Sequence, residues 1–594
     1  MEKTSLPIRF IGIAALIQGI LLTLIYRSVE NEMWPGSDPV WLAAITTFTL
    51  ALPFLLFMTI TKDNIVSALR YMLPISIVLA AIGAYAGLQL VPQERIDDDL
   101  SIALFIFTTQ IAIFKALMYV QHFLNKQAIS YHNLFKFSWR NFITYGECLL
   151  FTVIFWGILH LGAGLFSILG IDIFSELLSK DWVIIPTLSV AFGLAVAIFR
   201  NITHTTDNIA TILQTLIKFL LPVLSIVSLS FLVTLPFTGL DKLWKTGSGS
   251  LLLMWLQALT LFFLNSVYKD DPNNRPYHLV LHRLIYLSIL ALPVYSVIVS
   301  YGLSLRIEQY GLTVSRCWAV IICVLLSCFA IGYTLSIFRQ FDAWIHGVHK
   351  VNSIMGVVVM LSMLLVNTPL LNLQAISANN LIDRYVATTH VNEFQWTELD
   401  IRYFESYLGR QGYLALQALK NDIKDTDPTL LARIEQAYQP KVTKDDTFTQ
   451  VDFEQNLTLW PNADAIPQTL INALFKEETK NEWHNAYANQ YFLLAIDLNN
   501  DGLPELISIT QTDYSAFAEM WQQNPADNKW SSTSMHSSQL QRDIPIGRLV
   551  QQNAIQVTQP QWHDLHIGPL TFQVEPTPIN QSKISEDNTE DSKD

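Results

Sequence analysis

Apolar residues dominate the first 371 positions of the chain, in long runs separated by short polar segments. The runs approach about 20 residues, the length that a helix needs to cross the hydrocarbon core of a bilayer. They are continuous rather than alternating, which favours helices over the strands of a membrane barrel. We predict eleven transmembrane helices, at residues 8–26, 40–61, 72–91, 100–121, 141–169, 182–199, 211–235, 249–268, 284–303, 316–338 and 353–371.

The apolar runs end near Leu371, and the chain is polar and acidic from about Gln374 onward. The segment Ala378–Gln439 is charged, and its apolar positions fall near helical spacing, which predicts a helical region after the last span. These positions are Leu408, Leu414, Leu416 and Leu419. A polar linker, Lys441–Asp446, follows.

The last part of the chain has the mixed pattern of a small soluble domain. Residues 470–480 are predicted to form a helix, and residues 491–496 and 506–509 to form strands. The predicted fold class is a polytopic all-α membrane domain followed by a small soluble α+β domain. The boundaries are 1–371 for the transmembrane domain, 372–440 for a helical post-membrane segment, 441–576 for the soluble domain and 577–594 for a disordered acidic tail.

Composition supports a membrane protein. Hydrophobic residues make up 51% of the 594 positions and charged residues 15%, with a mean hydropathy of +0.32. Soluble domains carry about 25% charged residues. The net charge of -13 argues against a nucleic-acid partner, because phosphate contacts need clustered Lys and Arg. The four cysteines lie in apolar runs without the spacing of a zinc site or a disulfide framework.

The loops predict an orientation. The run from Met1 to Tyr26 resembles a signal peptide, but it has no small-residue cleavage site and further spans follow, so we interpret it as an uncleaved first helix. With the N-terminus in the cytoplasm, cytoplasmic segments hold thirteen Lys and Arg residues against seven on the other side. The odd number of spans then places the soluble domain in the periplasm, outside a bacterial inner membrane.

Three segments resemble a known family of bacterial membrane proteins. Leu134–Ile171 begins with a Phe-x-Trp-Arg-Asn entry, here Phe137–Asn141, and continues as a helix rich in Phe, Trp and Leu. Arg306–Arg316 is similar to an Arg-Ile-x-x-Tyr-Gly-x-Thr-x-x-Arg element, and Leu399–Leu419 is similar to a Gly-Arg-x-Gly segment. The family is domain-of-unknown-function family 4153. The resemblance covers roughly the first 420 residues and implies an architecture and a location, but no reaction.

The motif residues have structural interpretations. Trp139 and Arg140 are placed as an interfacial anchor at the start of the fifth span. Gly311 permits a tight turn, and Thr313 is expected to cap the helix that follows. The alternative is that the arginines beside this turn bind lipid headgroups or a substrate. The other motif residues in these elements are Tyr310, Arg316, Gly409 and Arg410.

The sharpest local motif lies in the soluble domain, in the sequence AIDLNNDGLPELISI at Ala495–Ile509. Its oxygen donors follow the spacing of a calcium-binding loop, with a glycine, Gly502, at the sharp turn. The donors in loop order are Asp497, Asn499, Asp501, the carbonyl of Leu503, and Glu505. Strands flank the loop and its twelfth position is Ser508, so it differs from an EF-hand. The alternative is a plain β-hairpin turn, because Asn-Asp-Gly is also a turn signal.

Three ionisable residues stand inside predicted spans, where such residues are expensive and a functional role is the default hypothesis. Lys115 in the fourth span and Glu147 in the fifth have similar depth, which makes an ion pair geometrically feasible, and Lys218 has comparable depth. They predict a polar cavity that is open to the cytoplasm. The alternative is that both lysines snorkel to the interface and Glu147 is paired structurally.

Enzyme motifs are absent from the sequence: it contains no GxSxG, HExxH or Walker A pattern. We therefore favour a non-enzymatic envelope protein with an anchoring, sensing or assembly role. Its soluble domain would bind calcium and a protein or glycan partner, and its helices would contact the lipid bilayer. The alternative is a transporter or lipid-handling permease that uses the region of Lys115, Glu147 and Lys218. A membrane-embedded enzyme has no motif in its support.

Overall fold

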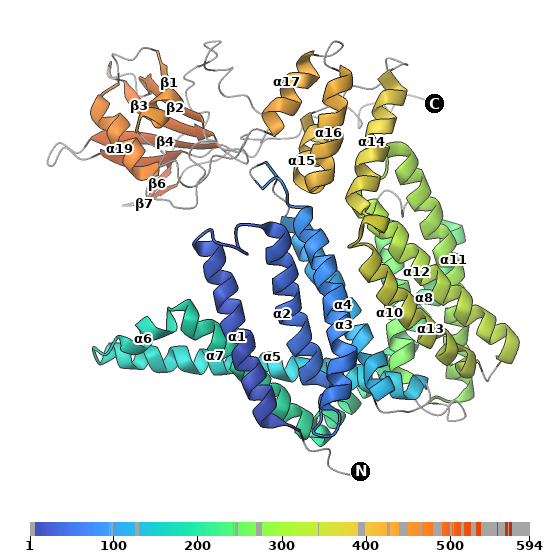
Figure 1. The fold of residues 1–594 in the computed structure, drawn as a ribbon. Helices are drawn as coiled ribbons and strands as arrows, with labels where there is room; N and C mark the ends of the chain where they lie inside the picture. Colours follow the sequence, from blue (N-terminus) through green and yellow to red (C-terminus); the bar gives the residue numbers. More distant parts are fainter. Residues whose placement is uncertain are drawn as a thin grey trace, which may run out of the picture. The chain divides into compact units, whose positions relative to one another are not determined.

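A computed structural model shows a long helical part followed by a small sheet (Figure 1). The chain forms two compact units, residues 1–440 and 441–594. The structure describes residues 6–93, 95–96, 99–124, 130–240, 243, 247–268, 276–341, 344–389, 398–423, 428–438, 450–461, 466–478, 490–498, 502, 504–511, 516–523, 530–535, 550, 555, 565–567 and 570–572.

The described residues of the first unit include eleven helices that are long and apolar enough to cross a membrane, as predicted. They are α1 (Ile8–Glu30), α2 (Pro39–Thr59), α3 (Ile65–Leu88), α4 (Asp99–Leu124), α5 (Tyr131–Ile168), α7 (Asp181–Asn201), α8 (Thr203–Thr238), α10 (Gly249–Val267), α11 (Leu279–Tyr310), α12 (Val314–Gln340) and α13 (Ile345–Leu365). A short helix, α6 (Ile173–Leu178), joins α5 to α7.

Five helices begin at least five residues earlier than their apolar runs predict. α3 begins at Ile65 rather than at residue 72, α5 at Tyr131 rather than 141, α8 at Thr203 rather than 211, α11 at Leu279 rather than 284, and α13 at Ile345 rather than 353. The added turns carry polar side chains such as His132 and Lys136. Hydropathy detects only the apolar part of a helix, which lies in the hydrocarbon core, and the helix continues beyond it into polar residues.

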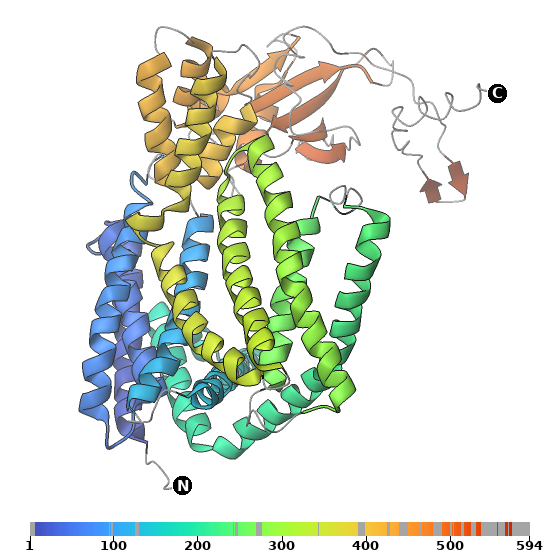
Figure 2. The same cartoon turned by 90° about the vertical axis from the view of Figure 1, so that its right-hand side faces the viewer.

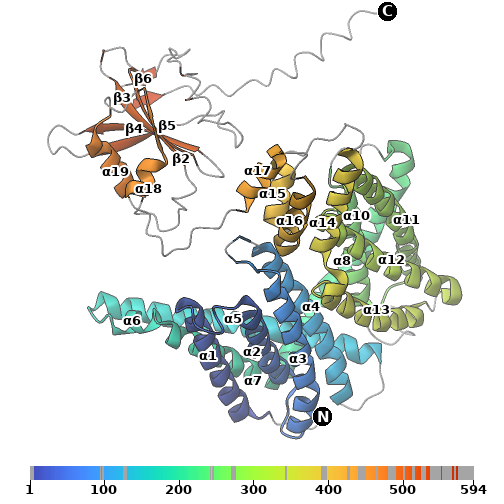
Figure 3. The same ribbon diagram turned by 45° about the horizontal axis from the view of Figure 1, so that its top comes forward.

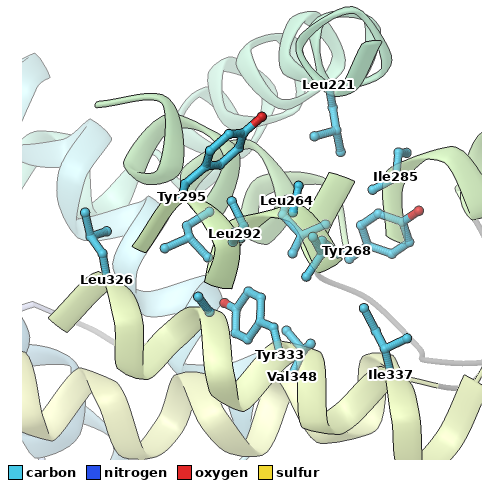
Figure 4. Packing of buried hydrophobic residues seen from close by; sticks show 14 of the residues in the cluster. Leu221, Leu264, Tyr268, Ile285, Leu292, Tyr295, Leu326, Tyr333, Ile337 and Val348 are labelled. Carbon is cyan, nitrogen blue, oxygen red and sulfur yellow. The ribbon is translucent and has the colours of Figure 1, made fainter. Parts of the chain in front are cut away.

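Two separate apolar cores hold these helices together. One core draws on α1 to α5 and α7, which we call the N-terminal bundle, and the other on α8 and α10 to α13, the C-terminal bundle. The two groups are distinct in Figure 3, and Figure 2 shows the C-terminal bundle after a quarter turn. In the second core, Leu221, Leu264, Tyr295, Tyr333 and Val348 come from five different helices (Figure 4).

Small residues bring α1 and α7 into close contact. A methyl group placed on Gly19 of α1 would lie 2.5 Å from the Cα of Pro186, and one on Gly193 of α7 would lie 2.6 Å from the Cβ of Ala15. Small residues let membrane helices approach closely enough for van der Waals packing, since hydrocarbon provides no hydrophobic drive between helices. This contact therefore fixes the position of α7 in the N-terminal bundle.

The post-membrane segment packs as part of the first unit. It contains the short 3-10 turn η2 (Pro369–Leu371) and the helices α14 (Leu373–Thr389), α15 (Glu398–Tyr407), α16 (Gly409–Ile423) and α17 (Pro428–Ala437). Side-chain hydrogen bonds join it to the ends of α3 and α4. Gln374 Nε2 donates to Ser101 Oγ at 2.7 Å, and Arg95 Nη1 donates to the carbonyl of Tyr438 at 3.3 Å.

The second unit contains a five-stranded sheet in the order β1-β2-β3-β4-β5, in which only β1 and β2 are parallel. Its elements are α18 (Gln450–Gln455), β1 (Leu457–Trp460), α19 (Gln468–Glu478), β2 (Gln490–Ile496), β3 (Glu505–Gln511), β4 (Ala516–Gln523) and β5 (Trp530–Met535). A separate hairpin joins β6 (Leu565–Ile567) to β7 (Leu570–Phe572). The predicted linker 441–446 and tail 577–594 lie outside the described residues.

Both faces of β2 are covered, which explains its continuous apolar sequence. Leu493 packs with Leu470 of α19 on one face, whereas Leu494 packs with Ile507 on the other. The helix at 470–480 and the two predicted strands are present as α19, β2 and β3. The sequence did not predict β1, β4 or β5; β1 is short and β5 is mostly polar.

We expect Gly19→Val to weaken the α1–α7 contact, because the larger side chain overlaps the backbone at Pro186. Overpacking of this kind typically costs about 1–3 kcal/mol. The measurement is thermal unfolding of the purified full-length protein in detergent. Gly157→Val on α5 is the matched control, because a Cβ at Gly157 meets nothing within 4 Å. Equal melting temperatures for the two variants would contradict close packing at Gly19.

Candidate functional site

Lys115 is a part-buried cation within a membrane-spanning helix. It shares one face of α4 with Thr108 and Tyr119, which are seven residues before it and four after it. Asn367 Nδ2 donates to Thr108 Oγ1, and Tyr119 Oη donates to the carbonyl of Ser353, both at 2.8 Å. Lys115 therefore lies on the face of α4 that meets α13, where the two bundles join.

The Lys115 ammonium has no hydrogen-bond or ion-pair partner among the described residues. The two bonds between α4 and α13 set an antiparallel register that places Lys115 level with Val357–Met360, a purely apolar turn. An unpaired charge away from water is unfavourable by several kcal/mol. Packing of α4 against α13 therefore does not explain why a lysine stands at position 115.

Glu147 and Lys218 lie in other surroundings. Glu147 Oε2 accepts a hydrogen bond from Thr206 Oγ1 of α8 at 3.1 Å, and its Oε1 is buried with no partner in the described part of the chain. Lys218 is exposed on α8, with its Nζ 5.8 Å from the centre of the Tyr277 ring. This cation–π contact fits a lysine that snorkels from the bilayer.

No contact joins Lys115, Glu147 and Lys218 in the part of the chain that the structure describes, so they do not share one polar site. Sequence position predicts their depth, but it does not predict the direction in which each side chain points around its helix. Lys115 points toward α13, whereas Glu147 points toward α8. The structure does not pair Lys115 with Glu147, which similar depth alone had made feasible.

His122 is a candidate that sequence reasoning missed. It is 1% exposed, and neither ring nitrogen has a hydrogen-bond partner among the residues described. It lies seven residues after Lys115 and three after Tyr119, so the three residues form a stripe along α4. That spacing was the available signal; taken alone, a histidine at the end of an apolar run resembles a packing residue.

Two arginines, Arg140 and Arg200, form hydrogen bonds to backbone carbonyls where α5 passes the junction of α7 and α8. Arg140 Nη2 donates to the carbonyl of Arg200 at 3.4 Å. Arg200 Nη1 donates to the carbonyls of Phe57 at 2.5 Å and Ile60 at 3.0 Å, at the end of α2. Trp139, beside Arg140 in the motif, stacks on Phe262 of α10, with ring centres 6.5 Å apart. The structure thus places this motif pair at helix–helix contacts.

A buried aromatic network closes one end of the C-terminal bundle. Trp344 Nε1 donates to His282 Nε2 at 3.2 Å, so the other ring nitrogen carries the proton and donates to Tyr268 Oη at 3.0 Å. Burial raises the pKa of the Tyr268 hydroxyl well above its usual range, which keeps the group protonated. Each ring nitrogen of His282 therefore has a partner, and the network is sufficiently explained by packing.

The Arg306–Arg316 motif forms a corner between helices. Gly311 has a φ of +74°, which favours glycine, and its carbonyl accepts from Arg316 Nη1 at 2.7 Å. Tyr310 gives a second carbonyl to the same nitrogen at 3.1 Å. Thr313 occupies the N-cap position of α12, but its Oγ1 contacts Ser315 Oγ instead of a backbone N–H. The predicted turn is present, and the predicted side-chain cap is not.

The third motif begins α16. Gly409 has a φ of +46°, and Arg410 Nη1 donates to the carbonyl of Val91, just after α3, at 2.8 Å. The neighbouring Gln411 donates to Gln89 Oε1 at 2.7 Å. These contacts give the motif a role in docking α16 onto the end of α3.

The calcium-type loop joins β2 to β3, whose register pairs Ile496 with Glu505. Asp497 Oδ2 accepts from the N–H of Gly502 at 2.9 Å, and Glu505 Oε2 accepts from the N–H of Leu498 at 2.6 Å. Gly502 has a φ of +88°, which confirms a sharp turn that favours glycine. Asn499, Asp501 and Leu503 lie outside the described residues.

The Asp497 carboxylate is suited to bind a cation. Its Oδ1 is buried and has no hydrogen-bond partner among the loop residues that the structure describes, while Oδ2 accepts a hydrogen bond from the loop backbone. A buried carboxylate oxygen without a donor is unfavourable unless a proton or a metal ion reaches it. Among the described residues no three His, Cys, Asp or Glu side chains gather into a metal site. A calcium site here needs oxygens from Asn499, Asp501 and Leu503.

Comparison with known proteins gives one match. The family model described as "Domain of unknown function (DUF4153)" matches residues 5–419, which include most of the first unit and none of the sheet. No curated protein and no solved structure matches the chain. The match extends through all eleven candidate spans and the three motifs. This multi-pass membrane protein therefore belongs to the DUF4153 family.

Proposed function

We propose that the protein is a non-enzymatic protein of the bacterial inner membrane whose C-terminal unit lies in the periplasm and binds calcium. The observation that carries the calcium proposal is the unpartnered, buried Oδ1 of Asp497 in a loop with a positive-φ glycine. The membrane helices would anchor this unit, which would serve a sensing or assembly role toward a protein or glycan.

The proposed ligands are the side chains of Asp497, Asn499, Asp501 and Glu505 and the carbonyl of Leu503. Calcium takes about six to eight oxygens, so water would complete the set. The ion would supply positive charge beside two carboxylates that already accept hydrogen bonds from backbone N–H groups of the loop. Its effect would be structural, because it would fix the connection between β2 and β3.

We expect calcium to slow hydrogen exchange at residues 490–511 of the full-length protein in detergent. At one hundred times its dissociation constant, a ligand stabilises the bound form by about 2.7 kcal/mol. Asp497→Asn should abolish the effect, because it removes the charge that the ion needs. Glu519→Gln, which removes an acidic group from β4 of the same sheet, should leave it intact. Exchange that is insensitive to calcium, or equally sensitive in Asp497→Asn, would refute the site.

The proposed orientation follows from the eleven candidate spans and the excess of basic residues on the N-terminal side. Alkaline phosphatase fused after Asp594 should be active, because it folds only outside the cytoplasm, and a green fluorescent protein fused there should be dark. A fluorescent and phosphatase-negative pair of fusions would place the C-terminal unit in the cytoplasm.

A second function, passage of a polar solute through the membrane unit, is favoured by the unpaired Lys115 between the bundles. We expect Lys115→Met to raise the unfolding free energy by about 1 kcal/mol or more, because it removes an uncompensated charge and keeps a similar shape. Lys136→Met on α5 is the control, because Lys136 is exposed and surface changes usually stay within about 0.5 kcal/mol.

A water-filled path also makes Lys115→Cys reactive toward a charged thiol reagent in intact membranes. The exposed native Cys328 is first replaced by serine, and the native Cys148, which is fully buried in the N-terminal core, serves as an unreactive internal reference. Protection of the introduced cysteine, or a lower stability of Lys115→Met, would argue against the path.

A further inference from the structure

An apolar groove lies along the N-terminal bundle, between α1, α5 and α7. It has a volume of about 360 Å³, and Leu16, Phe151, Phe155, Thr187, Leu194 and Ile198 contribute to its lining. Three of these remain open to the surroundings: Leu16 is 46% exposed, Leu194 38% and Ile198 45%. Because these helices cross the bilayer, the groove faces lipid chains.

The groove follows the seam between α5 and α7, which run antiparallel. Phe151 of α5 packs edge-on against Phe199 of α7, and Arg140 of α5 reaches the carbonyl of Arg200. Arg140, Phe151 and Phe155 share one face of α5, because they are eleven and fifteen residues apart. On α7, Thr187 and Ile198 are about 16 Å apart along the axis. Arg200 is two residues further along but about 200° around the helix from Ile198, and its side chain reaches the end of α2.

The charged end of this seam has an excess of positive charge. Arg200 uses one nitrogen to bind two carbonyls of α2, and Arg140 binds one carbonyl of α7. Carbonyls satisfy hydrogen bonds but do not neutralise a guanidinium. Among the described residues, neither arginine has a carboxylate within ion-pair distance. The exposed Asp207 attracts Arg140 electrostatically from further away.

We propose that an anionic phospholipid binds along this seam, with its phosphate at Arg140, near the second cation Arg200, and one acyl chain in the groove. Arginine suits phosphate because its planar guanidinium offers several donors in a fixed fork. Basic pockets between membrane helices bind anionic headgroups in the same way. Arg140 shares one face of α5 with the groove residues Phe151 and Phe155, so a cation and the apolar trough follow one another along this helix, as the head and tail of a lipid do. This site depends on neither the calcium loop nor Lys115.

The test is lipid binding to the purified, delipidated full-length protein, followed by native mass spectrometry and thermal unfolding. Phosphatidylglycerol should bind and raise the melting temperature more than phosphatidylcholine with the same chains. Arg140→Gln should weaken phosphatidylglycerol binding roughly tenfold or more, because a hydrogen bond to a charged group is lost. Lys136→Gln, the same charge change one turn earlier on α5, should leave binding unchanged.

A second pair of variants tests the groove. Leu194→Trp fills it from a partly exposed position and should weaken phosphatidylglycerol binding, whereas Leu161→Trp on the lipid-facing part of α5, at a residue that is 65% exposed, should not. Inorganic phosphate should stabilise the protein far less than the lipid. Equal binding of both lipids, unchanged binding in both Arg140→Gln and Leu194→Trp, or equal stabilisation by inorganic phosphate would overturn the proposal.

Discussion

Carbonyl groups at helix ends are the constraint on which much of the first unit depends. The last four carbonyls of a helix have no partner within it, and an unpaired carbonyl away from water is costly. In this protein arginines reach several of them. Arg200 binds the carbonyls of Phe57 and Ile60 near the end of α2, Arg316 those of Tyr310 and Gly311 at the end of α11, Arg384 those of Glu308 and Gln309, and Arg410 that of Val91 after α3.

These arginine–carbonyl bonds also connect distant parts of the sequence. Arg410 and Val91 are 319 positions apart, and Arg95 and Tyr438 are 343 apart. Arginine–carbonyl hydrogen bonds therefore also hold the helices that follow the last span against the ends of the membrane helices. A guanidinium at a helix C-terminus is also favoured by the helix dipole. A carbonyl leaves the cation without a counter-charge, so arginines near the bilayer surface keep the capacity to attract an anion.

The sequence predicted a structural element correctly where one physical requirement acts on a contiguous stretch of residues. The bilayer demands length and apolar character, so the eleven spans were predictable, including those interrupted by Pro74 or Pro293. The buried strand β2 was predictable from its apolar run, and the turn at Gly502 from its Asn-Asp-Gly sequence. Each of these features is determined by residues that are adjacent in the sequence.

The candidate sites depended on information that a linear pattern does not contain. The depth of Lys115 and Glu147 is similar, but the packing of α4 on α13 and of α5 on α8 directs them to different neighbours. His122 gains significance only when α4 is seen to bury it without a partner. Arg140 was identified as part of a motif, and its relation to Arg200, 60 positions away, required the fold.

Two ionisable side chains of the membrane helices lie at contacts between the two separate cores. Lys115, at the contact of α4 with α13, and Glu147, at the contact of α5 with α8, lie where one bundle meets the other. Apolar residues at these positions would join the two cores more firmly, since a buried charge weakens the packing around it. Each core instead closes on its own helices, and the boundary between the bundles holds ionisable groups.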